Sequence, residues 1–428
     1  WIPRRLLQLL EDNMASPFPT PFASGSTTRR APTAQESATG FPTGPADDNL
    51  FNYLMHEKQV AINKLAAQFE NSASTVALNY SLDDETLLDQ IMLAYAAVIK
   101  QDMEITVGAG EDYETILEAM NWLSNYMVAD GVTVLILPVA GSYNHALESI
   151  PGHPDGRRII IRGPALGGAV PAEVDFVVSG ATDADRAADR VDNNTMLQSR
   201  YPVKITCSGT AVDVGNDVIT IENILFIGSG AGAGIKAQNG SVYCQQVATH
   251  YFETGKLVEG TGLIQGRNMS ASGCNGGGFT VSFSGAIQVE EGTCLSIGNM
   301  GTGIGTSFGG SIQCKGAVVK GNKDAFLASF GGNIQANSSK AQTNENVAYL
   351  VTNDGVINCQ YSEADGHVTS YSVLNGGTVN AQYSESLNAT TDYKATTHGG
   401  VIITGYTGDA TCSPAVNTIG NGNAYIKN

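Results

Sequence analysis

The sequence predicts a mainly β protein: a single-stranded parallel β-helix with about 22–23 residues per coil, preceded by an extended arm and a short helical region. First, apolar residues recur at spacings of 22, 23, 25, 22, 23, 22 and 23 residues. Second, another series of apolar residues lies eight or nine positions earlier in the chain than the first. We call the two series ladders; they keep the same period and share the same longer spacing of 25 residues. Third, glycine provides 50 of the 428 residues and often stands in pairs just before the first ladder. So short a repeat has no room for two helices, but it suits three short strands and their turns.

The two ladders are expected to form two columns of side chains inside the β-helix. The first ladder consists of Val242, Ile264, Ile287, Ile312, Ile334, Ile357, Val379 and Ile402. The second consists of Phe279, Ile304, Phe326, Tyr349, Tyr371 and Tyr393. Because side chains alternate along a strand, the position two residues after the first ladder also points inward. Small residues occupy it in most coils, namely Cys244, Cys314, Ala336, Cys359, Ala381 and Thr404.

The seven cysteines are interpreted mainly as small core residues. Cys314 and Cys359 share one column but lie two coils apart, roughly 9–10 Å by the spacing of strands. That separation exceeds the Cα distance of about 7 Å that a disulfide tolerates. None of the seven forms a C-x-x-C pair and the six histidines are scattered, so no metal site is expected and no cofactor is assigned.

Residues 1–45 are expected to be an extended, Pro-rich arm. Six of the 14 prolines fall between residues 15 and 45, among Ser, Thr and Gly, and such a stretch has too little apolar content to fold alone. Arg29 and Arg30 are the basic pair of that stretch, and we expect the arm to become ordered when it docks on a partner. Residues 1–13 are interpreted as a segment upstream of a natural start at Met14 rather than a signal peptide.

Residues 46–103 are expected to form a helical neck or anchor. Apolar residues over positions 48–69 fall three, four or eight apart, which is a helical spacing. Ser81 and Asp84 resemble a capping box, and a second apolar stripe follows it over residues 82–101. Both stripes are interpreted as core or self-association surfaces.

Residues 104–163 are expected to form the entry to the β-helix, as strand, helix, strand and strand. Residues 104–107 are short and β-branched, and the runs 132–139 and 158–162 are strand-like. Asp112 is expected to cap a helix whose inward residues are Ile116, Met120, Leu123 and Tyr126. We expect this helix to cover the end of the β structure, because an open sheet edge must be protected.

Residues 164–428 are expected to contain the β-helix and a C-terminal tip. Residues 228–234 (Gly-Ser-Gly-Ala-Gly-Ala-Gly) lack the following Lys-Ser/Thr of a phosphate-binding loop and are interpreted as a corner. An acid-rich segment with two arginines is expected to be a solvated loop without calcium-binding spacing; its acids are Asp183, Asp185, Asp189 and Asp192.

The candidate functional residues are two Tyr-Ser-Glu triplets 22 residues apart. Tyr361 and Glu363 are expected to stand directly beside Tyr383 and Glu385 on the next coil. Aromatic faces and carboxylates suit sugar rings and hydroxyls, so these four residues are candidate glycan contacts. Glu363 and Glu385 are also the candidate catalytic carboxylates, with a solvated surface as the plain alternative. Glu290-Glu291 and the pair Glu253 and Glu259 carry less information.

Composition excludes two classes of partner. Forty-one acidic and 23 basic residues give a net charge of −18, which argues against nucleic-acid binding. No apolar run approaches the length of a membrane span, so no membrane insertion is expected.

The arm with Thr27-Thr28-Arg29-Arg30, followed by a helical segment, resembles the virion-attaching end of phage tail fibres. The stretch 105–163 is similar to the entry to the pectin-lyase-like parallel β-helix of phage tailspikes. The resemblance implies a virion protein at the tail tip, usually a homotrimer, whose arm binds tail-tip or baseplate proteins, with Arg29 and Arg30 as docking candidates. It also implies adsorption to host surface polysaccharide or lipopolysaccharide.

Two other classes compete with this adhesive, non-enzymatic interpretation. One is a polysaccharide depolymerase, a glycoside hydrolase or lyase, on the same scaffold. The other is a secreted bacterial adhesin, which predicts an export signal.

Overall fold

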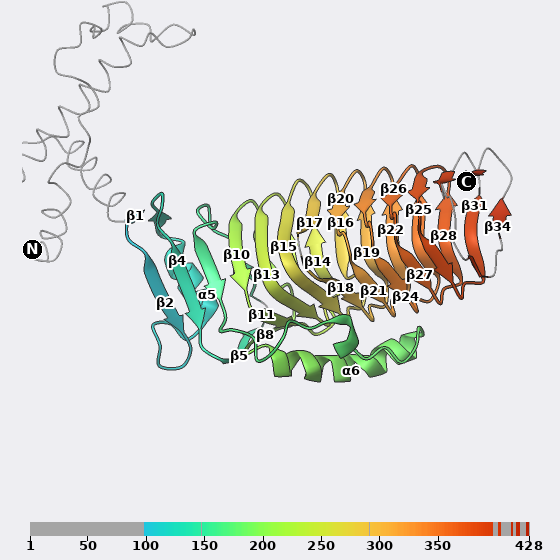
Figure 1. Cartoon of the computed structure of the whole chain (residues 1–428). Coiled ribbons are helices and arrows are strands. Elements are labelled where there is room, and N and C mark those ends of the chain that lie inside the picture. Colours follow the sequence, from blue (N-terminus) through green and yellow to red (C-terminus); the bar gives the residue numbers. More distant parts are fainter. Residues whose placement is uncertain are drawn as a thin grey trace, which may run out of the picture. The chain divides into compact units, whose positions relative to one another are not determined.

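A computed structural model describes residues 98–146, 148–290, 292–396, 401–403, 412–413, 417–419 and 425–427. The arm, including Arg29 and Arg30, and all of the expected helical neck before residue 98 lie outside these residues. The described part is a parallel β-solenoid, in which each coil contributes one strand to each of three faces (Figure 1). The predicted fold class is therefore confirmed.

Face 1 carries the first ladder. Its strands are β2 Met103–Val107, β4 Val134–Pro138, β7 Ile159–Arg162, β10 Val218–Glu222, the first halves of β13 Ser241–His250 and β15 Leu263–Ser272, β17 Ala286–Val289, β20 Ser311–Gln313, β23 Asn333–Gln335, β26 Val356–Asn358, β29 Thr378–Asn380, β32 Val401–Ile403 and β35 Tyr425–Lys427.

Face 2 is joined to face 1 through the long strands β13 and β15, so the two faces form one 22-stranded sheet. Besides the second halves of these strands it contains β5 Gly141–Ala146, β8 Val203–Cys207, β11 Ile224–Ile227, β18 Cys294–Ile297, β21 Val318–Lys320, β24 Lys340–Gln342, β27 Glu363–Asp365, β30 Glu385–Leu387 and β33 Cys412–Ser413.

Face 3 is a separate 11-stranded sheet, with one strand from each of the coils that begin with β4 through β32. The first and last strands of face 1, β2 and β35, have no described counterpart in it. It contains β6 Ile150–Pro151, β9 Val212–Asp213, β12 Ala233–Ala237, β14 Thr254–Val258, β16 Phe279–Ser282, β19 Thr302–Ser307, β22 Asp324–Ser329, β25 Val347–Thr352, β28 Thr369–Leu374, β31 Thr391–Thr396 and β34 Asn417–Ile419.

The first ladder is a single column of paired residues. Ile312 pairs with Ile287 on one side and with Ile334 on the other, and the register continues to Ile402. The small residues two positions later, from Cys244 to Ala381, are buried beside this column, while Thr404 lies outside the described residues. All six cysteines with described side chains are buried free thiols, as predicted.

The second ladder is a stack of buried rings on face 3. Phe326 lies on Tyr349 with ring centroids 4.9 Å apart and an interplanar angle of 3°. Tyr371 and Tyr393 continue the stack at 5.1 and 5.4 Å. The hydroxyl of buried Tyr349 hydrogen-bonds to the Ser339 hydroxyl at 2.9 Å, which satisfies its polar atom.

A lysine occupies the same column one coil before Phe279, the first member of the second ladder. Lys256 pairs with Phe279 in the strand register and is fully buried. Its Nζ donates to the Ser270 carbonyl at 2.7 Å and to Thr249 Oγ1 at 3.2 Å, and it lies 4.9 Å from the centroid of the Phe279 ring. Burial lowers the pKa of this amine to about 8. A polar side chain is tolerated here because both acceptors lie inside the coil.

Asparagines form a third inner column at the corner between faces 2 and 3. The backbone N–H of Asn299 donates to Oδ1 of Asn322 at 2.9 Å, and that of Asn322 donates to Oδ1 of Asn344 at 2.8 Å. His367 ends the described series: its Nδ1 lies 3.3 Å from the Asn344 amide nitrogen, and its Nε2 lies 2.9 Å from the Ala341 carbonyl. The column satisfies corner amides that the strand ladders leave unpaired.

The structure of the N-terminal coil differs from the expected helices in two details. Val98–Ile99 is strand β1, paired with β3 (Met127–Val128), and not the end of a helix over residues 82–101. Helix α5 (Ile116–Leu123) is capped by Thr115 in a capping box with Glu118 and not by Asp112. The Asp112 carboxylate instead accepts hydrogen bonds from the backbone and hydroxyl of Thr106.

Helix α5 protects the first edge of face 3. It buries Ile116, Met120 and Leu123 in the core and contacts β6, the edge strand of that sheet. Three of the four residues expected to point inward are buried in this helix, whereas Tyr126 lies beyond its end and is only half-buried.

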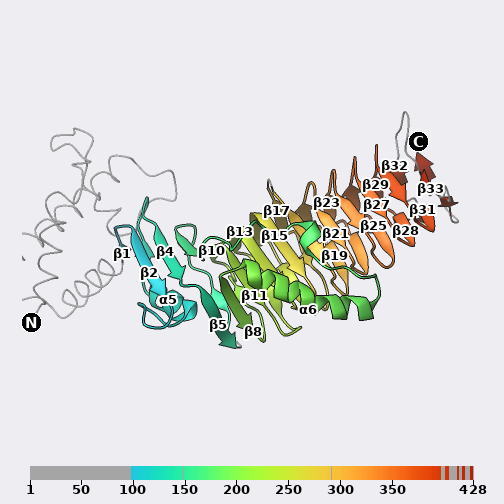
Figure 2. The ribbon, with the colours of Figure 1, turned by 60° about the horizontal axis from the view of Figure 1, so that its bottom comes forward.

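The acid-rich segment is a helix, not the expected loop. Helix α6 (Asp183–Arg200) begins at Thr182, whose side chain forms a capping box with Asp185, and a short 3₁₀ turn (Glu173–Asp175) precedes it. The helix lies lengthwise along the solenoid (Figure 2). Residues of this insertion, including Phe176 and Leu197, pack on outward apolar side chains of face 2 such as Leu295.

The buried side of α6 is polar, which explains the wrong prediction. Arg186, Asp189, Asn193 and Leu197 recur at helical spacing and are buried. Arg186 pairs with Asp183 at 2.5 Å and with Glu345 of the solenoid at 2.7 Å. A search for apolar periodicity misses a helix whose contact face is held by hydrogen bonds and ion pairs.

Phe326 and Phe308 lie on neighbouring coils, and each stacks on a ring of the next coil, so they give a matched test of core packing. Phe326→Ala removes a buried ring and should lower the free energy of unfolding by about 3–5 kcal/mol. Phe308→Ala removes an outward ring, which stacks on Phe330 at the same 4.9 Å, and should cost about 1 kcal/mol or less. Urea unfolding followed by circular dichroism measures both; equal losses would contradict the assigned interior.

His250, beneath α6, should make the solenoid sensitive to acid. Burial, with a smaller effect of the Arg190 charge, lowers its pKa from 6.5 to about 4. The unfolded chain therefore takes up a proton at higher pH than the folded chain, so stability is complete above about pH 6.5 and falls towards pH 4. The loss from this group should reach about 3 kcal/mol.

The measurement is the urea midpoint at pH 7 and at pH 4.5. His250→Gln should show a smaller loss between these pH values than the parent chain. His145 and His367, whose pKa values burial also lowers, are present in both proteins and cancel in the comparison. An unchanged pH dependence in His250→Gln would exclude the assignment.

Candidate functional site

Tyr361 and Tyr383 form an outward-facing pair at the corner between faces 1 and 2. Their rings are stacked with centroids 5.0 Å apart, and the residues are 62% and 49% exposed. Both have positive φ angles, 57° and 58°, a backbone region that bulky residues rarely adopt. The strain indicates that something other than backbone preference keeps an aromatic residue at this corner.

The Tyr-Ser-Glu triplet places its three side chains in different directions. Ser362 and Ser384 point inward, and the Ser384 hydroxyl donates to the Cys359 carbonyl at 2.6 Å. Glu363 and Glu385 then open β27 and β30, where they pair directly across the two strands. The prediction that equivalent residues of adjacent coils stand side by side is confirmed.

The carboxylates differ in their surroundings. Oε1 of Glu363 accepts a hydrogen bond from Nε2 of Gln342 at 3.1 Å, and Glu363 is half-buried, whereas Glu385 is exposed. The two acids lie on the face-2 side of the tyrosine corner. We name Tyr361, Glu363, Tyr383 and Glu385 the tyrosine patch.

A second exposed aromatic stack was not predicted. Phe283, Phe308 and Phe330 stand at the corner between faces 3 and 1, with centroids 5.1 and 4.9 Å apart and interplanar angles of 8°. All three are about half exposed and have positive φ. A signal existed in the sequence, because each stands four residues before a member of the first ladder. These positions face outward, so they belong to neither of the two inward columns that the apolar pattern predicts.

Stacking limits what these rings can offer to a ligand. Rings that lie on one another cover each other's faces, so only the end faces and the outer edges remain available. In the tyrosine patch, Ser338 occupies the equivalent corner of the preceding coil and is too small to cover the ring of Tyr361. Among the described residues, Tyr361 therefore stacks on Tyr383 alone, and it is the more exposed residue of the pair.

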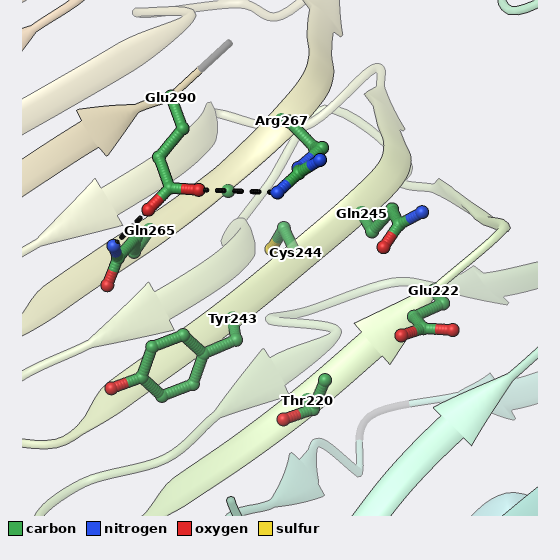
Figure 3. Close-up of a pocket in the computed structure, with 9 residues that line it drawn as sticks. Thr220, Glu222, Tyr243, Cys244, Gln245, Gln265, Arg267 and Glu290 are labelled. Carbon is green, nitrogen blue, oxygen red and sulfur yellow. Dashed lines mark hydrogen bonds and ion pairs between the residues drawn. The ribbon is translucent and has the colours of Figure 1, made fainter. Parts of the chain in front are cut away.

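A polar pocket lies on the outer surface of face 1, over β10, β13, β15 and β17 (Figure 3). Its volume is about 330 Å³, near the lower end for small-molecule sites. It is lined by Thr220, Glu222, Tyr243, Cys244, Gln245, Gln265, Gly266, Arg267 and Glu290. The sequence gave little weight to Glu290 and assigned Cys244 to the interior, and the other lining residues gave no signal because outward positions follow no apolar pattern.

The charged groups of the pocket are held by neighbours. Glu290 accepts a hydrogen bond from Nε2 of Gln265 at 2.6 Å and lies 3.7 Å from the Arg267 guanidinium (Figure 3). Glu222 accepts a hydrogen bond from Nε of Arg162 at 2.5 Å. These contacts orient both carboxylates before any ligand arrives.

The pocket has no reactive thiol at its floor. Burial raises the pKa of the Cys244 thiol to about 12, so it stays protonated at neutral pH and is not a nucleophile. The backbone approaches closely here, because a Cβ on Gly266 would lie 2.1 Å from the Cys244 carbonyl oxygen. The pocket therefore offers hydrogen bonds and charge rather than covalent chemistry.

Among the described residues, no group of three or more His, Cys, Asp or Glu side chains is placed to hold a metal ion. Within the same part of the chain, neither helix has the length and apolar composition to cross a membrane. Comparisons of the chain with protein-family models, curated protein sequences and solved structures find no match.

Proposed function

We propose that this chain is a structural virion protein, a phage tail fibre or tailspike, that adsorbs to host surface polysaccharide or lipopolysaccharide through its β-solenoid. The observation that carries this proposal is the tyrosine patch, an exposed aromatic pair beside two carboxylates on a rigid scaffold. Aromatic faces pack against the C–H groups of sugar rings, and carboxylates accept hydrogen bonds from sugar hydroxyls.

The N-terminal arm belongs to the same proposal. Residues 1–45, with Arg29 and Arg30, would dock on a tail-tip or baseplate protein and localise the chain to the virion. A homotrimer would present three copies of each contact surface. Several shallow contacts then give avidity without a deep pocket.

The binding test uses purified host lipopolysaccharide or capsular polysaccharide immobilised on a sensor surface. Tyr361→Ala and Tyr383→Ala should each weaken binding about tenfold or more, because each loses a ring that packs on the glycan. Tyr361→Phe should retain most of the binding, because it keeps the ring.

The matched control is Phe308→Ala, which removes a ring of similar exposure from a different corner. It should leave glycan binding nearly unchanged. Equal losses in the phenylalanine and tyrosine variants would contradict the placement of the contact surface, and no binding by the parent chain would contradict the adhesive function.

A polysaccharide depolymerase is the second candidate function. It is favoured by Glu363 and Glu385, which pair directly on adjacent strands, because about one strand spacing is close to the carboxylate separation of retaining glycosidases. Glu222 and Glu290 also line one pocket, but they lie three strand spacings apart. Against it stands the openness of both carboxylate pairs: Glu290 and Glu385 are exposed, whereas an acid catalyst needs a protected site.

We expect no new reducing ends or unsaturated sugars when the protein is incubated with host polysaccharide. If products appear, Glu222→Gln and Glu290→Gln test the pocket, while Glu363→Gln and Glu385→Gln test the tyrosine patch. Loss of product formation in any of these variants would replace the adhesive function with an enzymatic one.

A further inference from the structure

We propose that the corner between faces 3 and 1, with the strands that flank it in five successive coils, is a self-association surface that binds a second copy of this chain. We call this surface the uncharged wedge. It runs from β16 and β17 to β28 and β29 and consists of residues 280–288, 305–313, 327–335, 350–358 and 372–380. The inference rests on the strand register and the residue types of this corner, so it is independent of glycan binding.

The first argument is the lack of charge. Each of the five segments has nine residues, and together they contain one charged residue, Asp354, although charged residues make up 15% of the chain. By contrast, each of the face-2 strands β21, β24, β27 and β30 carries at least one charged residue. Depletion of charge is typical of the core of a protein interface. Because the chain has a net charge of −18, two copies can approach each other most easily through such a surface.

The second argument is the phenylalanine stack at the apex of the wedge. Phe283, Phe308 and Phe330 are about half exposed, and their φ angles are 57°, 51° and 48°. In the next two coils the same corner is occupied by Asn353 and Asn375, with φ angles of 49° and 56°. Asparagine adopts this backbone region more readily than a bulky aromatic residue. The chain thus contains a less strained residue for this corner, and the use of exposed rings in three coils indicates a contact surface.

The third argument is the regular spacing of the side chains, which favours a second copy over other partners. On face 1 a row of amides pairs from coil to coil, formed by Gln288, Gln313, Gln335, Asn358 and Asn380. Nδ2 of Asn358 donates to Oε1 of Gln335 at 3.1 Å, so the row is held in part by its own hydrogen bonds.

Rows of this kind repeat at the strand spacing of about 4.8 Å. A second copy of the solenoid presents side chains with the same repeat, so each coil can contact an equivalent coil. Stacked strands with asparagine and glutamine ladders pack face to face in this way. A partner without the repeat would fit the wedge at only a few positions.

The size of the wedge is sufficient for a specific complex. Five coils span about 24 Å along the solenoid, and nine residues around the bent corner span about 25 Å. The area of roughly 600 Å² per copy falls at the lower end for stable interfaces, which bury about 600–1,000 Å² on each partner.

The experiment is chemical cross-linking of the full chain with a short bismaleimide. Ser284→Cys places a thiol at the apex beside Phe283, and Ser199→Cys places a matched thiol on the exposed side of α6. The six native cysteines with described side chains are buried, and the parent chain provides the blank. Ser284→Cys should form cross-linked copies at least about tenfold faster than Ser199→Cys. Because cross-linking depends on proximity, it tests the wedge itself, even where other parts of the chain also associate.

Charge variants in the Ser284→Cys background then test the cause of association. Gln313→Glu adds a carboxylate to the amide row without changing its size and should slow cross-linking about tenfold, because it brings like charges together. Gln198→Glu adds the same charge on α6 and should leave the rate unchanged. Asp354→Asn removes the one charge of the wedge and should increase the rate. Phe308→Ala removes one of three rings and adds no charge, so most copies should remain associated.

Circular dichroism and thermal unfolding check that each variant is folded. Equal cross-linking of Ser284→Cys and Ser199→Cys, or none in either, would overturn the inference and leave the wedge to a different partner. An unchanged rate in Gln313→Glu would overturn it as well. The proposed function fails separately: cross-linking at the wedge without adsorption to host polysaccharide refutes adhesion alone, and adsorption without cross-linking refutes the wedge alone.

Discussion

The structure depends on one constraint, the in-register pairing of equivalent residues on successive coils. Ile312 lies between Ile287 and Ile334 because the backbone returns to the same hydrogen-bonding position after each coil. Parallel pairing then forces like side chains to within one strand spacing of each other, about 4.8 Å. Every column, apolar or polar, is a consequence of this return.

The same stacking has different effects inside and outside the coil. Phe326 and Tyr349 exclude water and stabilise the interior, whereas Phe308 and Phe330 keep nearly the same ring geometry at an exposed corner. Polar residues enter the interior only where the coil supplies partners, as in the asparagine column and at Lys256. Stacking therefore fixes the geometry of the side chains in both places. Whether they point inward or outward decides whether they contribute to the core or can contact a ligand.

The insertion that contains α6 shows where pattern analysis fails. Its contact face is built from Arg186, Asp189 and Asn193, which are polar residues that a helical hydrophobic stripe does not contain. Their partners, such as Glu345, come from coils far along the chain. The capping box of Thr182 and Asp185 was a usable local signal, because it marks a helix start without reference to hydrophobicity.

The sequence by itself determined the coil, its period and the inward columns, because packing in a narrow interior restricts those positions to apolar or small residues. It also placed the tyrosine patch, since both members of each pair stand at fixed offsets from the ladder. Only the tertiary structure decided the pocket. Thr220, Tyr243, Arg267 and Glu290 come from four successive face-1 strands and face outward, where solvent imposes no pattern on residue type. The strand register gathers them at fixed offsets from the first ladder, but their residue types do not repeat from coil to coil, so no pattern singles them out.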